Sequence, residues 1–217
     1  MIDLTTMPLT DVASELAKKI EDHTAVVGVF GLGYVGLPFA VEKAKVGFSV
    51  IGFDRSEPRV GQVNDGDSYI LDVPTDELKP LVQKGLIRAT TDFTELDKVD
   101  VVVVAVPTPL TKNLTPDLQY VEAVTREVAK HLRPGQMVSL ESTTYPGTTD
   151  EVMKPILEAT GLKADVDFFL AHSLSALIPA TSATPPRTLP KLWVALALHH
   201  SNWRLSFMDK PLTTLSR

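Results

Sequence analysis

Three glycines follow a short apolar run near the start of the chain. Residues 25–30 are apolar apart from Gly28, and they lead into Gly31, Gly33 and Gly36, spaced as G-x-G-x-x-G. Such glycines allow a tight turn after a strand, a close approach of backbone to a ligand, and tight packing of the next helix. The N-terminus of that helix presents free N–H groups and partial positive charge. The pattern predicts a pyrophosphate-binding turn that includes Tyr34 and Val35.

An acid closes the next apolar run. Residues 48–53 end at Asp54, which lies 18 residues past Gly36. A carboxylate at this position can accept hydrogen bonds from both hydroxyls of an adenosine ribose, and it repels a 2′-phosphate. The combination favours NAD as the cofactor, while the adjacent Arg55, a further candidate for cofactor binding, keeps NADP as an alternative. A purely structural glycine turn is disfavoured because the strand, the helix and the acid are all present.

Hydroxyl groups follow two later apolar runs, in residues 106–109 and 141–149. Ligands of open α/β sheets bind beyond the carboxyl ends of the strands. We therefore expect a set of hydroxyl side chains at the nicotinamide end of the cofactor: Thr108, Ser142, Thr143 and Thr144.

Other polar residues have simpler interpretations. Thr148 and Thr149 precede a helical segment, and we expect them mainly to cap it. For Glu141 the simplest interpretation is a solvated strand end. The histidines show no metal-ligand spacing with acids or with each other, so no metal site is expected.

The elements that must position these residues alternate along the chain. Apolar runs of the kind found in buried parallel strands alternate with amphipathic helical segments, which predicts a doubly wound α/β fold with a parallel sheet. The expected strands cover residues 25–31, 48–54, 87–93, 100–109, 136–142 and 166–173. The expected helices cover residues 10–22, 37–47, 57–66, 75–85, 117–135 and 148–161.

Composition narrows the class of protein. The chain has 217 residues, 44% of them hydrophobic and 22% charged, with a net charge of −6, which argues against a nucleic-acid or anionic-membrane surface. There is no apolar run long enough to span a membrane, and the N-terminus does not resemble a signal peptide. Cysteine is absent, which excludes disulfides and a cysteine nucleophile in this chain. We expect a cytoplasmic protein.

The ordered motifs resemble one family. VFGLGYVGLPFA, VIGFD, VVAVPTP, SLESTTYPGTT and FFLAHS together resemble the N-terminal domain of the UDP-glucose/GDP-mannose dehydrogenase family, over about residues 25–173. The forms ESTTYPGTT and VPTPL are most similar to its UDP-N-acetylglucosamine or UDP-N-acetylmannosamine 6-dehydrogenase branch. A β-hydroxyacid dehydrogenase, whose N-terminal domain is related, is the alternative.

The resemblance implies that two NAD molecules in turn oxidise the C6 alcohol of a UDP-sugar to a carboxylate, through a thioester on a cysteine. It implies that Thr108 lies beside the nicotinamide and that Thr143 helps to position the catalytic water. The family is homodimeric through a central helix. That helix, with its catalytic lysine, the cysteine and the UDP-binding domain, has no counterpart here, so we expect an NAD-binding module that does not complete the oxidation.

The composition changes after Ser173. Residues 174–217 carry one acid, Asp209, and five bases, with many prolines and threonines. If the codons of Leu174 to Thr181 are read one base out of register, they can encode P-E-R-V-D-P-G-N, the segment that follows HS in the family. In the same shifted frame, two later stretches can encode family-like sequences. We therefore expect an N-terminal helical extension at 1–24, an NAD-binding domain at 25–173 and an out-of-frame tail at 174–217. A genuine, divergent C-terminal segment is the alternative.

Overall fold

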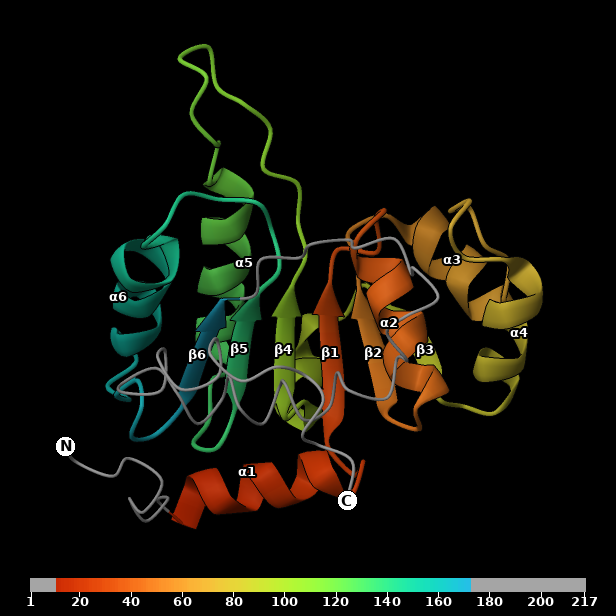
Figure 1. Cartoon of the computed structure of the whole chain (residues 1–217), viewed down its shortest axis with the longest axis horizontal. Coiled ribbons are helices and arrows are strands. Elements are labelled where there is room, and N and C mark those ends of the chain that lie inside the picture. Colours follow the sequence, from red (N-terminus) through yellow and green to blue (C-terminus); the bar gives the residue numbers. More distant parts are fainter. Residues whose placement is uncertain (1–10, 173–217) are drawn as a thin grey trace, which may run out of the picture.

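The computed structural model describes residues 11–172, so the interpretation of residues 174–217 lies outside the described part, as do the first ten residues. Six strands form one parallel sheet (Figure 1). They are β1 (Val26–Phe30), β2 (Ser49–Phe53), β3 (Ile87–Thr90), β4 (Val101–Val104), β5 (Met137–Leu140) and β6 (Phe169–His172), in the order β3-β2-β1-β4-β5-β6. The predicted doubly wound parallel sheet is confirmed.

The sequence order of the strands reverses between β1 and β4. Val27 pairs with Val50 on one side and with Val101 on the other, so β1 lies beside both halves of the sheet. The chain builds β1 to β3 outward in one direction and β4 to β6 outward in the other. Doubly wound sheets bind their ligands at such a switch point, beyond the carboxyl ends of the strands.

Helices cover both faces of the sheet. The helical elements are α1 (Asp11–Glu21), α2 (Gly36–Lys45), α3 (Glu57–Asp65), α4 (Thr75–Gln83), η2 (Phe93–Lys98), α5 (Gln119–Lys130), η3 (Thr149–Met153) and α6 (Lys154–Glu158). All six predicted helices are present, with shorter bounds than predicted. The short 3₁₀ segment η2 was not predicted.

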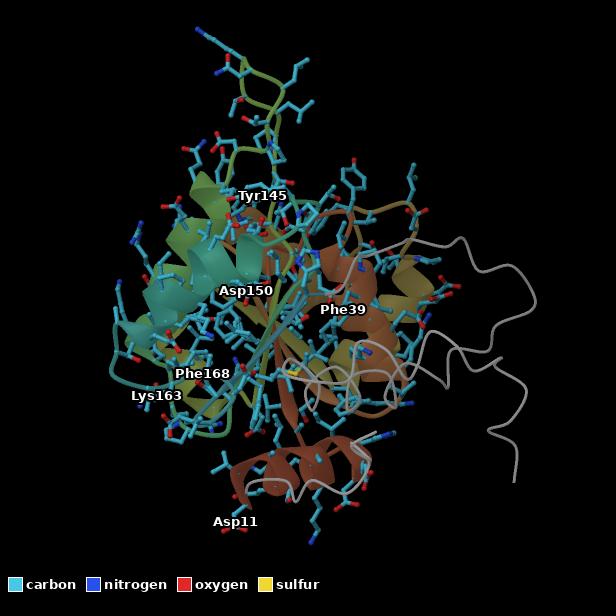
Figure 2. All side chains as sticks on the ribbon, turned by 60° about the vertical axis from the view of Figure 1, so that its left-hand side comes forward. Asp11, Phe39, Tyr145, Asp150, Lys163 and Phe168 are labelled. Carbon is cyan, nitrogen blue, oxygen red and sulfur yellow. The ribbon has the colours of Figure 1, made fainter. Side chains whose placement is uncertain are left out.

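The core has two layers of apolar side chains, one on each face of the sheet. One layer joins the sheet to α1, α2, α3 and α4, and the other joins it to η2, α5, η3 and α6. In β4, Val101 and Val103 belong to the first layer, while Val102 and Val104 belong to the second, so alternate residues face opposite sides. In Figure 2, Phe168 lies inside the molecule, whereas Asp11 and Lys163 lie at its periphery.

The helical segment predicted over residues 148–161 differs in detail from the prediction. Its first part, η3, is π-helical, and α6 then ends at Glu158. Thr148 does not cap it: its hydroxyl donates to the carbonyl oxygen of Tyr145 at 2.8 Å, and no side-chain cap bond is formed. The capping role predicted for Thr148 is therefore wrong, because its Oγ1 closes the preceding turn instead of accepting from the helix.

Asp100 joins the amino ends of the strands to α1, which runs beneath the sheet in Figure 1. Its carboxylate accepts from the backbone N–H of Val26 at 3.0 Å, from Lys19 Nζ at 3.1 Å and from Arg133 at 3.0 Å. Burial alone would raise the pKa of Asp100, but these hydrogen bonds outweigh it and hold the pKa below its ordinary value. The amino end of the sheet is thus covered, and the carboxyl end carries the pocket.

Candidate functional site: a dinucleotide pocket at the switch point

The glycine turn lies at the carboxyl end of β1. Gly31 has φ +87°, and a Cβ placed on it would lie 2.6 Å from the carbonyl oxygen of Ala105. A Cβ on Gly36 would overlap the carbonyl oxygen of Gly31. Neither position tolerates a side chain, because the turn, β4 and α2 approach each other too closely.

Gly33 differs from the other two glycines of the motif. A Cβ built on it meets no atom within 4 Å. Fold packing therefore does not require glycine at this position, whereas a ligand lying against the backbone would. This is the arrangement expected where a pyrophosphate contacts the turn.

Asp54 supports the turn with its carboxylate. Oδ2 accepts from the backbone N–H of Leu32 at 3.0 Å, and Oδ1 accepts from the N–H of Ser56 at 2.9 Å. The guanidinium of Arg59 lies 3.6 Å from Oδ2. Because each carboxylate oxygen can accept more than one hydrogen bond, the group keeps acceptor capacity for a ribose.

Tyr69 holds the turn from the other side. Its hydroxyl donates to the carbonyl oxygen of Leu32 at 2.7 Å. Tyr69 and Asp54 thus bind the C=O and the N–H of Leu32, respectively. Burial, together with the nearby charge of Asp54, raises the pKa of Tyr69 to about 12. The phenol therefore stays protonated at neutral pH and keeps donating its hydrogen bond.

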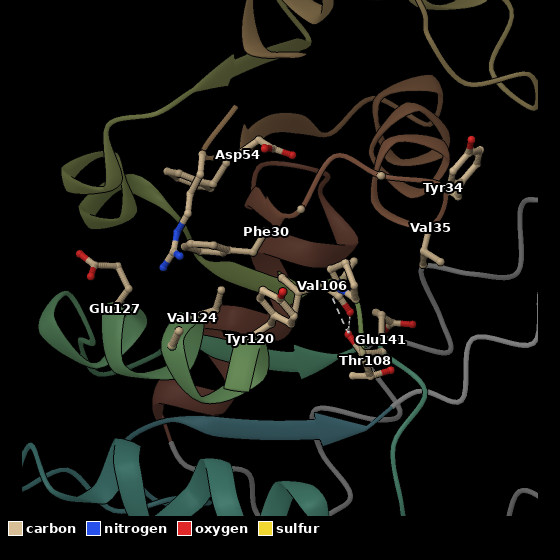
Figure 3. A pocket seen from close by; sticks show the side chains of 18 of the residues that line it. Phe30, Tyr34, Val35, Asp54, Val106, Thr108, Tyr120, Val124, Glu127 and Glu141 are labelled. Atoms are coloured by element: carbon tan, nitrogen blue, oxygen red, sulfur yellow. Dashed lines mark hydrogen bonds between the residues drawn. The ribbon is translucent and has the colours of Figure 1, made fainter. Parts of the chain in front are cut away.

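Two of the four hydroxyls predicted at the nicotinamide end, those of Thr108 and Ser142, join the loops that follow β4 and β5, whereas Thr144 Oγ1 is buried without a hydrogen-bond partner among the described residues. Ser142 Oγ donates to the carbonyl oxygen of Val106 at 2.7 Å and accepts from its N–H at 3.1 Å. Thr108 Oγ1 donates to the carbonyl oxygen of Thr143 at 2.6 Å. Figure 3 shows Thr108 beside Val106 and Glu141. The two loops are thus held together at one end of the cavity.

A cavity of about 690 Å³ connects these groups, a size typical of small-molecule sites. Its lining includes nearly all the predicted cofactor residues: Gly31, Gly33, Tyr34, Val35, Asp54, Arg55, Thr108 and Thr143. Gly36 is the exception, because it is buried at the start of α2. Among these, Tyr34 is 72% exposed and is drawn at the edge of the site in Figure 3.

Several lining residues were not predicted. The face of α5 contributes Tyr120, Ala123, Val124 and Glu127, and Phe93 and Arg59 complete that part of the wall. Residues three and four apart lie on one face of a helix, but the sequence predicted only an amphipathic helix in this segment. No signal in the sequence says that this second face borders a ligand.

Glu141 is also placed differently from the prediction. It is only 4% exposed, lines the cavity and accepts from Ser139 Oγ at 3.0 Å, so the interpretation as a solvated strand end is wrong. Its charge reaches Lys43 of α2, which is 3% exposed. Burial lowers the pKa of Lys43 to about 8, although Glu141 and Glu42 act in the opposite direction.

Residues 11–172 contain neither a clustered set of metal ligands nor a membrane-spanning helix. Within that range, no cluster of three or more histidine, aspartate or glutamate side chains could hold a metal ion. Within the same range, no helix is long and apolar enough to cross a membrane.

The fold and the pocket define a Rossmann-type dinucleotide-binding domain. Residues 25–184 match the model of the "UDP-glucose/GDP-mannose dehydrogenase family, NAD binding domain". The chain belongs to this family, and NAD is the cofactor of the matched domain. The match favours this family over the β-hydroxyacid dehydrogenases.

Relatives of known structure or curated description support this assignment to the family. The chain is 35% identical over 154 residues to the UDP-N-acetyl-D-mannosamine dehydrogenase of Pyrococcus horikoshii, covering 70% of this chain and 37% of the relative. It is 38% identical over 154 residues to the UDP-N-acetyl-D-glucosamine 6-dehydrogenase of Pseudomonas aeruginosa, covering 70% and 36%. A crystal structure of GDP-mannose dehydrogenase from Pseudomonas aeruginosa superposes with a TM-score of 0.64 at 37% identity, over 67% of this chain and 35% of that one. The matched region thus spans little more than a third of each relative.

Proposed function

We propose that the pocket binds NAD and that the chain is the NAD-binding part of a nucleotide-sugar 6-dehydrogenase acting on a UDP-sugar. The observation that carries the proposal is Gly33, which lines the cavity at the turn and whose open surroundings leave room for a ligand against the backbone. In this proposal Asp54 binds the ribose and the Thr108–Thr143 pair borders the nicotinamide, which is supported by their position in the lining of one cavity. When bound, NAD would accept a hydride from the sugar alcohol.

The residues of the chain bind and orient the dinucleotide. The turn at Gly33 and the N-terminus of α2 face the pyrophosphate, where free N–H groups favour negative charge. Asp54 accepts from the ribose hydroxyls and disfavours a 2′-phosphate. Arg55 borders the same part of the pocket and is the group that would favour NADP. Thr108 and Thr143 border the nicotinamide, and Thr143 is our candidate for positioning the water and the substrate.

This chain by itself is proposed to bind NAD without completing the oxidation. It contains no cysteine, so the thioester chemistry implied for the family has no nucleophile within these 217 residues. The sugar substrate and a homodimeric state therefore concern the family, and we assign neither to this chain alone.

Isothermal titration calorimetry tests the proposal. The chain should bind NAD and should prefer it to NADP, whereas Asp54→Ala should weaken NAD by about 10-fold or more through loss of charge-assisted hydrogen bonds. Asp97→Ala is the matched control, because Asp97 carries the same group on a side chain that is 70% exposed, pairs with His131 and does not line the cavity. No heat with millimolar NAD would refute the proposal. Production of NADH with a UDP-sugar would refute the proposed inactivity.

The division of the chain is proposed on sequence grounds. Residues 1–24 form an extension that includes α1, residues 25–173 form the NAD-binding domain, and residues 174–217 are read as an out-of-frame tail. Sequencing the coding DNA tests the last point. Restoring one base after Ser173 should open a long family-like frame, and a frame that stays unlike the family would refute it.

A further inference from the structure

Glu127 is the acid at the adenosine end of the pocket that the proposed function does not use. It belongs to α5, and its side chain is 26% exposed. Figure 3 shows it on the side of the pocket away from Tyr34 and Glu141. We propose that Glu127 selects a 6-aminopurine, so that the base of the bound dinucleotide is adenine and not a 6-oxopurine. The inference rests on the proposed function and extends it to the specificity of the same site.

The position of Glu127 follows from the direction of α5. Tyr120 and Glu127 lie on one face of this helix, two turns or about 10 Å apart along its axis. Tyr120 is near the start of α5, close to the loop that carries Thr108, so Glu127 borders the opposite stretch of the wall. In the proposed complex Asp54 binds the adenosine ribose. The base must then lie on the side of the ribose that is away from the pyrophosphate turn.

Aromatic and aliphatic side chains form an apolar wall at that end of the cavity. Phe30 and Phe53 stack with their ring centres 4.9 Å apart, and Phe93 lies 5.6 Å from Phe30. All three line the cavity with Val124, which contributes a further apolar surface. Such an apolar wall accepts any purine, because stacking does not read the edge of a base. Discrimination must come from a polar group beside the wall.

An ionised carboxylate only accepts hydrogen bonds, and adenine presents an amino group at its 6-position. A 6-oxopurine presents an acceptor oxygen there, which a carboxylate repels. Lys130 Nζ lies 2.6 Å from Glu127 Oε2, and the other lone pairs of the carboxylate are left for a ligand. Arg55 and Arg59, the cations that also line the pocket, are donors and cannot accept from an amino group.

The test compares NAD with nicotinamide hypoxanthine dinucleotide, in which a 6-oxo group replaces the 6-amino group. Calorimetry on the unaltered chain should give a preference for NAD of about 10-fold, which corresponds to one charge-assisted hydrogen bond. Glu127→Gln presents an amide that can donate to the oxo group or accept from the amino group. Its preference should fall to about 3-fold or less.

Glu122→Gln is the matched control. It removes the same charge from the same helix and breaks a similar ion pair, with Arg126 at 2.8 Å, but Glu122 does not line the cavity. Its ratio of affinities should equal that of the unaltered chain, and thermal unfolding of each variant reports folding. An unchanged ratio in Glu127→Gln, or an equal fall in Glu122→Gln, overturns the assignment. If NAD fails to bind the unaltered chain, the proposed function fails first and the assignment falls with it. Binding of NAD without a preference over the hypoxanthine analogue overturns the assignment alone.

Discussion

Asn64 pairs with Ala89 as a neighbouring strand would. Its Nδ2 donates to the carbonyl oxygen of Ala89 at 3.0 Å, and its Oδ1 accepts from the N–H of Ala89 at 2.7 Å. Ala89 belongs to β3, the edge strand on that side of the sheet. One side chain of α3 thus satisfies both backbone groups of an edge residue, which would otherwise be open to pairing with another chain.

Loss of the Asn64 amide should destabilise the fold. Asn64→Ala leaves two part-buried backbone groups without their partner, and we expect the free energy of unfolding to fall by about 1–3 kcal/mol. Asn64→Asp should cost at least as much, because a carboxylate cannot donate and would face the carbonyl oxygen of Ala89. Urea denaturation measures both. An aspartate variant as stable as the unaltered chain would mean that the paired geometry contributes little.

Alanine at Gly33 and at Gly36 should have opposite effects on folding and on binding. Gly33→Ala enters open space and should leave the melting temperature nearly unchanged, while the added methyl group weakens NAD binding by obstructing the pyrophosphate. Gly36→Ala drives a methyl group into the carbonyl oxygen of Gly31 and should lower the melting temperature by several degrees. Thermal unfolding with and without NAD separates the two. If Gly33→Ala lowers the melting temperature as much as Gly36→Ala does, the open position is not reserved for a ligand.

Replacing Asp100 by asparagine should destabilise the fold by about 2–3 kcal/mol at pH 7, because Lys19 and Arg133 lose their shared acceptor. The folded pKa of Asp100 is depressed, so its contribution is present above the unfolded pKa of about 4 and is lost as pH falls through the folded pKa. Denaturation at pH 7 and at pH 3 should therefore show a smaller acid effect in Asp100→Asn than in the unaltered chain. Asp97→Asn, which loses only an exposed pair with His131, should cost less than 1 kcal/mol, roughly the value of a surface ion pair. Equal acid sensitivity in Asp100→Asn and the unaltered chain would contradict the prediction.

Lys43 should make the fold more stable in mildly alkaline solution. Its folded pKa is about 8, against 10.5 when unperturbed, so between these values the unfolded chain binds more protons than the folded one. The free energy of unfolding then rises with pH across this window. Lys43→Met should remove that rise, which denaturation at pH 8 and pH 10 measures. Lys45→Met should keep it, because the pKa of Lys45 is raised above 10.5 and titrates outside the window. The prediction is wrong if Lys43→Met retains the full alkaline rise.

The strands and the cofactor turn could be predicted from the sequence because each is a local pattern. Val101 to Val104 form a continuous apolar run, and the spacing of Gly31, Gly33 and Gly36 is tied to one geometry. The acid at Asp54 follows from the end of the second strand. Each of these signals depends on residues close together in the chain, so no tertiary contact was needed to interpret it.

The rest of the site depends on packing between distant elements. Glu127 and Tyr120 look like the solvent face of a helix until α5 is docked beside Phe93. Burial of Lys43 against Phe39, whose ring centre is 5.0 Å from Nζ, likewise has no local signal, since lysine in a helix is normally exposed. Arg59 faces Asp54 only because α3 begins soon after the strand that the acid ends.

The ion pair between Lys19 and Asp100 spans 81 residues of the chain. During synthesis, α1 leaves the ribosome long before the carboxylate that anchors it has been translated. The apolar face of this helix, with Leu16 and Ile20, then has only part of the sheet, and not its anchor, to pack against. At a synthesis rate of about 5–20 residues per second, that interval lasts on the order of 4–16 seconds, during which the nascent chain presents a ready binding surface to chaperones.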